Sequence, residues 1–151
     1  MDIHHETLII ERNFTAPPER LFQAFADPKE RQVWSAPSPE IVIVIEETDV
    51  RTGGREIARC GRAGSLNWTM KVFYHRVTEG RQITFSEELW DGENILTVSL
   101  ITFDFEKHGI TGTRLKLTDQ ITSFVGESGI AGHRDGYTKA LTNLAASLIP
   151  A

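Results

Sequence analysis

The sequence has very little cysteine, no long apolar run and no cluster of basic residues. Its single cysteine, Cys60, excludes an internal disulfide and suits a reducing compartment or a small buried position. No stretch approaches the roughly 18 apolar residues of a membrane span. The first ten residues contain acidic and histidine side chains where a secretory signal needs a basic start. These absences predict a cytoplasmic protein that does not insert into a membrane.

Several kinds of functional site also lack their sequence signals. The net charge is -5 and lysine and arginine are dispersed, which argues against a nucleic-acid surface. The five histidines and the lone cysteine do not occur at metal-ligand spacing. Gly53-Gly54 lacks the Lys-Ser/Thr of a phosphate-binding loop, and no G-x-S-x-G nucleophile motif is present. We therefore expect neither a metal nor another cofactor.

The chain has the length and the composition of one globular domain over residues 1–151. Its hydrophobic fraction of 40% and charged fraction of 25% are too balanced for a disordered chain. A chain of this length can bury a single core.

The clearest helical pattern lies at the C-terminus, in residues 132–149. Tyr137, Leu141, Leu144 and Leu148 recur at spacings of four, three and four, which places them on one apolar face. That face needs a surface to cover, and most of the preceding chain has the character of β-strands. The pattern predicts a curved antiparallel sheet wrapped around this helix.

The rest of the chain reads as a first strand, two short helices and a meander of further strands. Proline and Asp-Pro signals begin and end the two short helices, and glycine-containing turns separate the later strands. A glycine-containing loop is expected at residues 124–132. The expected strands cover residues 7–14, 41–46, 55–60, 67–77, 81–90, 94–106 and 110–122, and the short helices cover residues 18–28 and 29–34.

The pattern of apolar and polar residues along three of the strands bears on which of their faces are buried. In residues 67–77, the face with Trp68, Met70, Val72 and Tyr74 is the expected inner face. In residues 94–106 neither face is cleanly polar, so the periodicity does not settle the inner side. Residues 41–45 are apolar throughout, which indicates a strand covered on both faces or a homodimer contact.

This order, together with several short segments, resembles the family of homologues of the activator of heat-shock-protein-90 ATPase. That family lies within the START-like, helix-grip superfamily, also called SRPBCC. The resemblance implies an α+β helix-grip fold, with a curved antiparallel sheet of six to seven strands, a long C-terminal helix and two short helices after the first strand. The segments that carry it are FTAPPERLFQAFADP at 14–28, Trp34 with Pro37, RTGGR at 51–55, EGRQITF at 79–85, GTRLKLT at 112–118 and GYTKALTNL at 136–144.

The resemblance also implies a cavity between the sheet and the C-terminal helix, and the sequence contains apolar residues to line it. His133 lies four residues before Tyr137, so both project from one helical face. The candidate ligand-binding residues are Trp34, Trp68, Met70, Tyr74, Phe85, Trp90, Ile101, Phe103, His133, Tyr137 and Leu141.

Three classes of function are consistent with these features. The first is a binding protein for a small apolar or amphipathic molecule, such as a lipid, a polyketide or an aromatic compound. The second is an enzyme of the cyclase or hydrolase kind found in the superfamily, with His133 or Glu87 as the acid or base. At most one of the neighbours Glu87 and Glu88 faces inward. The third is an interaction module with a chaperone partner, as the family's co-chaperone members are.

Overall fold

The structure is a computed structural model that describes residues 2–148. Within them, strands and helices follow one another in the predicted order, and the two short helices come directly after the first strand. The elements are β1 (His4–Phe14), α1 (Pro18–Ala26), α2 (Pro28–Ser35), β2 (Ile41–Thr48), β3 (Arg55–Arg62), β4 (Ser65–Thr78), β5 (Gln82–Asp91), β6 (Asn94–His108), β7 (Gly112–Ser123) and α3 (Glu127–Ser147).

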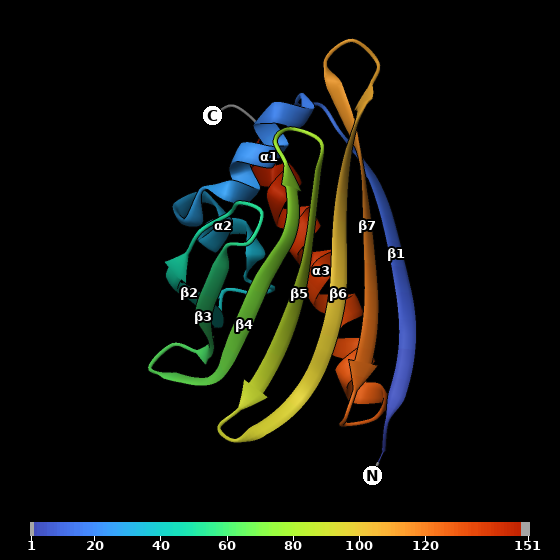
Figure 1. Cartoon of the computed structure of the whole chain (residues 1–151). Coiled ribbons are helices and arrows are strands. Elements are labelled where there is room, and N and C mark those ends of the chain that lie inside the picture. Colours follow the sequence, from blue (N-terminus) through green and yellow to red (C-terminus); the bar gives the residue numbers. More distant parts are fainter. Residues whose placement is uncertain (1, 149–151) are drawn as a thin grey trace.

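The seven strands form one antiparallel sheet in the order β1-β7-β6-β5-β4-β3-β2. Strands β2 to β7 are a meander, and β1 pairs with β7 along its whole length, from His4 opposite Ser123 to Phe14 opposite Thr113. Figure 1 shows the sheet curving around α3, with α1 and α2 near the C-terminal end of that helix. The predicted helix-grip fold is confirmed.

The two short helices are joined at Asp27 and fixed there by local chemistry. Asp27 ends α1 in an extended conformation, and its Oδ1 accepts a hydrogen bond from the backbone N–H of Lys29 at 2.8 Å. It therefore caps α2, whose first residue is Pro28. The amide of Asn143 in α3 donates to the backbone carbonyl of Ala36 at 2.9 Å, which ties the end of α2 to the long helix.

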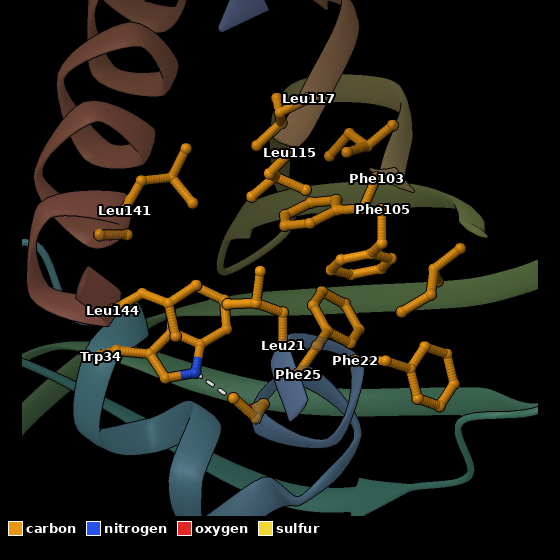
Figure 2. Packing of buried hydrophobic residues seen from close by; sticks show 14 of the residues in the cluster. Leu21, Phe22, Phe25, Trp34, Phe103, Phe105, Leu115, Leu117, Leu141 and Leu144 are labelled. Atoms are coloured by element: carbon orange, nitrogen blue, oxygen red, sulfur yellow. Dashed lines mark hydrogen bonds between the residues drawn. The ribbon is translucent and has the colours of Figure 1, made fainter. Parts of the chain in front are cut away.

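The main core lies where α1, α2 and the C-terminal half of α3 meet the inner face of the sheet. Figure 2 shows Leu141 and Leu144 of α3 facing Trp34 and the aromatic residues of α1 and β6. The Trp34 indole donates through Nε1 to the backbone carbonyl of Ala24 at 3.0 Å, so its polar atom is satisfied. This core holds α1 and α2 against the sheet, leaving the other half of α3 to form the site described below.

The prediction for the start of α3 was wrong. The helix begins at Glu127 rather than at residue 132, so most of the expected loop at 124–132 is helical. Gly126 has a positive φ of 70°, which lets the chain turn from β7 directly into the helix. Gly129 and Gly132 concealed the helical pattern because glycine adds no apolar side chain. The predicted end at residue 149 lies outside the described residues.

The structure also settles which strand faces point inward. In β4, Val72 and Tyr74 are buried on the predicted inner face. In β6, the inner face carries Ile101, Phe103 and Phe105, whereas Leu100 on the opposite face is 41% exposed. Sequence alternation could not make this choice because outward-facing Val98 and Leu100 are as apolar as the inner set.

Strand β2 is an edge strand, and its two faces meet different surroundings. Ile41, Ile43 and Ile45 face the interior, whereas Val44 on the opposite face is 38% exposed. The homodimer contact through this strand stays a prediction. Among residues 2–148, no helix combines the length and the apolar character that a membrane crossing requires.

Candidate functional site

A pocket of about 460 Å³ lies between the inner face of the sheet, α2 and the N-terminal half of α3. This volume is within the range of roughly 300–1,000 Å³ typical of small-molecule sites. Its wall is mostly apolar. The aromatic part of the lining consists of Phe25, Trp34, Trp68, Phe85, Phe103 and Tyr137, and the three isoleucines of β2 add an aliphatic side.

The pocket exists largely because α3 presents small residues to it. Gly129, Gly132, Gly136 and Ala140, at spacings of three, four and four, lie along the side of the helix that lines the pocket. A Cβ atom added at Gly132 or Gly136 would meet no other atom within 4 Å. The empty volume therefore occupies the room that larger side chains at Gly132 and Gly136 would take, whereas Gly129 packs closely against Ser123.

One group of polar side chains at the pocket is centred on Arg31 of α2. Its guanidinium forms an ion pair with Glu56 of β3 and donates to the hydroxyl of Tyr74 at 2.9 Å. That hydroxyl donates in turn to Glu56 at 2.9 Å, and Thr48 donates to the same carboxylate at 2.6 Å. Arg31 and Glu56 are both buried, and the guanidinium also stacks over the Phe25 ring at 4.7 Å. The charges of Arg31 and Glu56 therefore compensate each other.

A second polar group links α3 to the sheet through His133. Its Nδ1 lies 2.7 Å from Oδ2 of Asp119, which is fully buried, and its Nε2 lies 3.1 Å from the hydroxyl of Thr97. Burial by itself would lower the pKa of His133, but the hydrogen bond and charge of Asp119, with the charge of Glu87, raise it. Both ring nitrogens are engaged by protein partners, so neither is available to another molecule.

Glu87 and Tyr137 line the pocket with polar atoms that make no hydrogen bond within residues 2–148, and the buried hydroxyl of Ser35 also lacks a partner there. Glu87 shares the inner face of β5 with Phe85 and Leu89, and all three line the pocket. Burial raises the pKa of Glu87 to about 7, with Asp119 and Glu56 adding to the rise and His133 and Arg31 opposing it. Burial also raises the pKa of Tyr137 well above its usual value, so its hydroxyl stays protonated. Both groups face the empty volume.

The structure brings most of the predicted site residues together. The candidates that line the pocket are Trp34, Trp68, Met70, Phe85, Phe103, His133, Tyr137 and Glu87. Their role in binding stays a prediction.

Four predicted residues lie elsewhere, which corrects their expected place in the wall. Ile101 and Leu141 are fully buried in the core, so the pocket does not reach them. Tyr74 is also fully buried and meets the pocket only through its bonds to Arg31 and Glu56. Trp90 follows an irregularity in the pairing of β5 with β6, and Lys71 stacks on it at 4.9 Å, away from the pocket wall.

Several important residues were missed from the sequence. Glu56 shares one face of β3 with Ala58 and Cys60, and Asp119 shares one face of β7 with Leu115 and Leu117, so alternation could have indicated that both acids face inward. Arg31 had no such signal because α2 is only eight residues long. Among residues 2–148, no group of three His, Cys, Asp or Glu side chains is arranged to hold a metal ion.

The antiparallel sheet that grips a C-terminal helix, with an apolar pocket between the two, defines a protein of the helix-grip class. Within that class, the chain belongs to the family described as activator of Hsp90 ATPase homolog 1-like protein. The family's sequence profile matches residues 15–148. The family resemblance seen in the sequence is thus confirmed.

The fold is similar to solved structures of bacterial proteins. The Mll3558 protein from Rhizobium loti is 29% identical, with 98% of this chain and all (100%) of that chain covered and a TM-score of 0.83. A protein from Rhizobium leguminosarum is 27% identical, with 96% and 95% covered and a TM-score of 0.83. The AHSA1 protein from Silicibacter pomeroyi, at 22% identity, 95% and 97% coverage and a TM-score of 0.77, is similar in fold alone. A search of curated proteins found no match.

Proposed function

We propose that this protein binds one small apolar or amphipathic molecule, such as a lipid, a polyketide or an aromatic compound, between the sheet and α3. The observation that carries the proposal is the glycine-lined pocket of about 460 Å³ with a mostly apolar wall. A helix that served only as core would fill this space with side chains, because protein interiors are close-packed. Gly132 and Gly136, which border empty space, are also unfavourable for helix stability, which is consistent with selection for space.

The polar groups of the pocket support a ligand with an apolar body and one polar end. Arg31 and His133 are each engaged by protein partners, whereas the polar atoms of Glu87 and Tyr137, on the same pocket, make no hydrogen bond to any residue from 2 to 148. A ligand that satisfies these atoms would be held in one orientation, as the few polar groups of small-molecule sites commonly do. The apolar rings would then supply most of the affinity.

Native mass spectrometry of protein purified from its own host tests this function. A stoichiometric small molecule released on gentle denaturation is the expected result. In parallel, a lipid and aromatic panel should raise the unfolding temperature, since a ligand present at 100 times its Kd stabilises by about 2.7 kcal/mol. An empty protein that no member of the panel stabilises would contradict the proposal.

Filling the pocket provides the matched control. The double substitution Gly132→Leu with Gly136→Leu places side chains in empty space and should abolish binding while the protein remains folded. Lys139→Leu introduces the same side chain on the exposed side of α3 and should leave binding unchanged. Equal binding by all three proteins would show that the ligand lies elsewhere.

A second candidate function is acid–base catalysis in the same pocket, in a cyclase or hydrolase type of reaction. It is favoured by the carboxyl of Glu87, because a pKa of about 7 suits proton transfer at neutral pH. His133 is less suited because Asp119 and Thr97 engage both its ring nitrogens. Once a ligand is known, Glu87→Gln should abolish its turnover and retain its binding. An unchanged ligand after prolonged incubation with the native protein would count against catalysis.

A further inference from the structure

The charged side chains around the pocket do not balance. Arg31 is paired with Glu56, and His133 is paired with Asp119. Glu87 is the remaining acid, and within residues 2–148 it forms no ion pair. When it is ionised, three carboxylates stand against two cations, so the pocket carries one net negative charge that the protein itself leaves uncompensated.

The uncompensated carboxylate shares the pocket with several aromatic rings. Phe85 precedes it by two residues on the same face of β5, and the ring centroids of Phe25 and Phe85 are 5.8 Å apart. Phe103 lies 5.0 Å from Phe25 and 6.1 Å from Tyr137, centroid to centroid. A carboxylate supplies an opposite charge, and ring faces attract cations, so the two features together favour a positively charged group over a neutral or negative one.

We propose that the ligand is an organic cation, with a protonated amine at Glu87 and an apolar or aromatic body against the surrounding rings. This inference rests on the proposed binding function and specifies the chemical class of its ligand. The Tyr137 hydroxyl would accept a second N–H of the ammonium group through its oxygen. An ammonium group has three donors and no acceptor, so both protein atoms would act as acceptors.

The groups that face Glu87 imply that binding of the cation weakens as pH falls. Arg31 from α2 and His133 from α3 oppose the bound cation, whereas Glu56 from β3 and Asp119 from β7 attract it. The thiol of Cys60 stays neutral below pH 8 because burial raises its pKa to about 11. The hydroxyls of Tyr74, Tyr137 and the cross-strand neighbour Ser99 also stay neutral. As pH falls through about 7, Glu87 gains a proton and the attraction is lost.

Three probes of one shape test this inference: 1-naphthylmethylamine, 1-naphthalenemethanol and 1-naphthoic acid. Their dissociation constants should be measured by calorimetry at pH 8 and at pH 5.5. At pH 8 the amine should bind at least about tenfold more tightly than the alcohol, and the carboxylate should bind most weakly. At pH 5.5 the advantage of the amine should largely disappear, because its affinity falls by up to about tenfold per pH unit below the pKa of Glu87.

The variant that carries the test is Glu87→Gln, and its matched control is Glu88→Gln. Glu88 is the adjacent acid on the opposite face of β5, where it accepts a hydrogen bond from the Trp90 indole at 2.9 Å. Glu87→Gln should remove the preference for the amine and leave binding of the alcohol within about twofold, whereas Glu88→Gln should change neither. Glutamine keeps the size of the side chain, so the fold should persist.

Different results would contradict the binding function and the organic-cation inference. If the alcohol and the amine bind equally at pH 8, or if the carboxylate binds best, the organic-cation inference is wrong and the binding function stands. If Glu88→Gln removes the preference as fully as Glu87→Gln does, the assignment to Glu87 is wrong. If no probe binds and the host-purified protein is empty, both the binding function and its cationic ligand are contradicted.

Discussion

The ion pair between Arg31 and Glu56 should be among the most sensitive points of the fold. Both side chains are buried, with 7% and 6% of their side-chain surfaces exposed. Replacing Arg31 by methionine would leave the Glu56 carboxylate buried without its cation. Breaking a buried pair in this way typically destabilises a protein by about 3–5 kcal/mol. In a chain of this size, that corresponds to a fall in Tm of roughly 6–20 °C.

A neighbouring pair provides the control. Arg20 of α1 and Glu30 of α2 are 2.6 Å apart, but 39% and 33% of their side-chain surfaces are exposed. Arg20→Met should therefore cost only about 0–1 kcal/mol, because solvent screens an exposed ion pair. The comparison uses the same type of substitution on two adjacent short helices.

Urea denaturation followed by circular dichroism would measure both changes as free energies of unfolding. A double variant, Arg31→Met with Glu56→Gln, should regain much of the lost stability because it removes the buried charge as well as its partner. If Arg31→Met destabilises the protein no more than Arg20→Met does, the buried network does not hold α2 on the sheet.

Three further predictions concern the pocket side of α3 and β5. Gly136→Ala should raise the free energy of unfolding by about 1 kcal/mol, because alanine favours the helix and its methyl meets empty space; a fall in Tm would contradict this. The raised pKa of His133 means that its bond to Asp119 contributes stability below pH 6.5, and that this stability is lost as pH rises through the folded-state pKa. NMR titration of the ring should show the raised pKa, and Asp119→Asn should lower it. Glu87 has a folded-state pKa raised from 4.5 to about 7, so it destabilises the protein progressively as pH rises from 4.5 through 7. Glu87→Gln should therefore add up to about 3 kcal/mol at pH 8 and almost nothing at pH 4, and equal effects at both values would refute the shift.

Much of the architecture could be predicted from local patterns. Pro17-Pro18 and Asp27-Pro28 marked the short helices because proline constrains the backbone wherever it occurs. Glycine-containing turns marked the ends of the strands because the backbone preference of glycine is also a local property. The start of α3 was missed because Ile130 is its one buried apolar side chain and glycines occupy the neighbouring inward positions, so too few apolar side chains recur there to form a helical pattern.

The site was less accessible because its chemistry depends on partners that are far apart in the chain. His133 was a candidate on its titration range alone, but its role is set by Asp119, which lies 14 residues earlier on a different element. Arg31 and Glu56 come from a helix and a strand whose meeting no periodicity predicts. Conversely, Glu87 could be recognised as a candidate from its strand position, although which of two adjacent acids faces inward required the sheet register.

The glycines of α3 also divide that helix into two halves that differ in local stability. Leu141 and Leu144 anchor the C-terminal half in the main core, whereas the other half is held by Ile130, in a small cluster with Leu8 and Ile121, and by the polar contacts of His133. Each glycine lowers the local helix stability by about 1 kcal/mol relative to alanine. The first turns of α3 should therefore unwind transiently without loss of the whole fold, and their amides should exchange with deuterium sooner than those near Leu144. Since these turns line the pocket, such unwinding would transiently enlarge it.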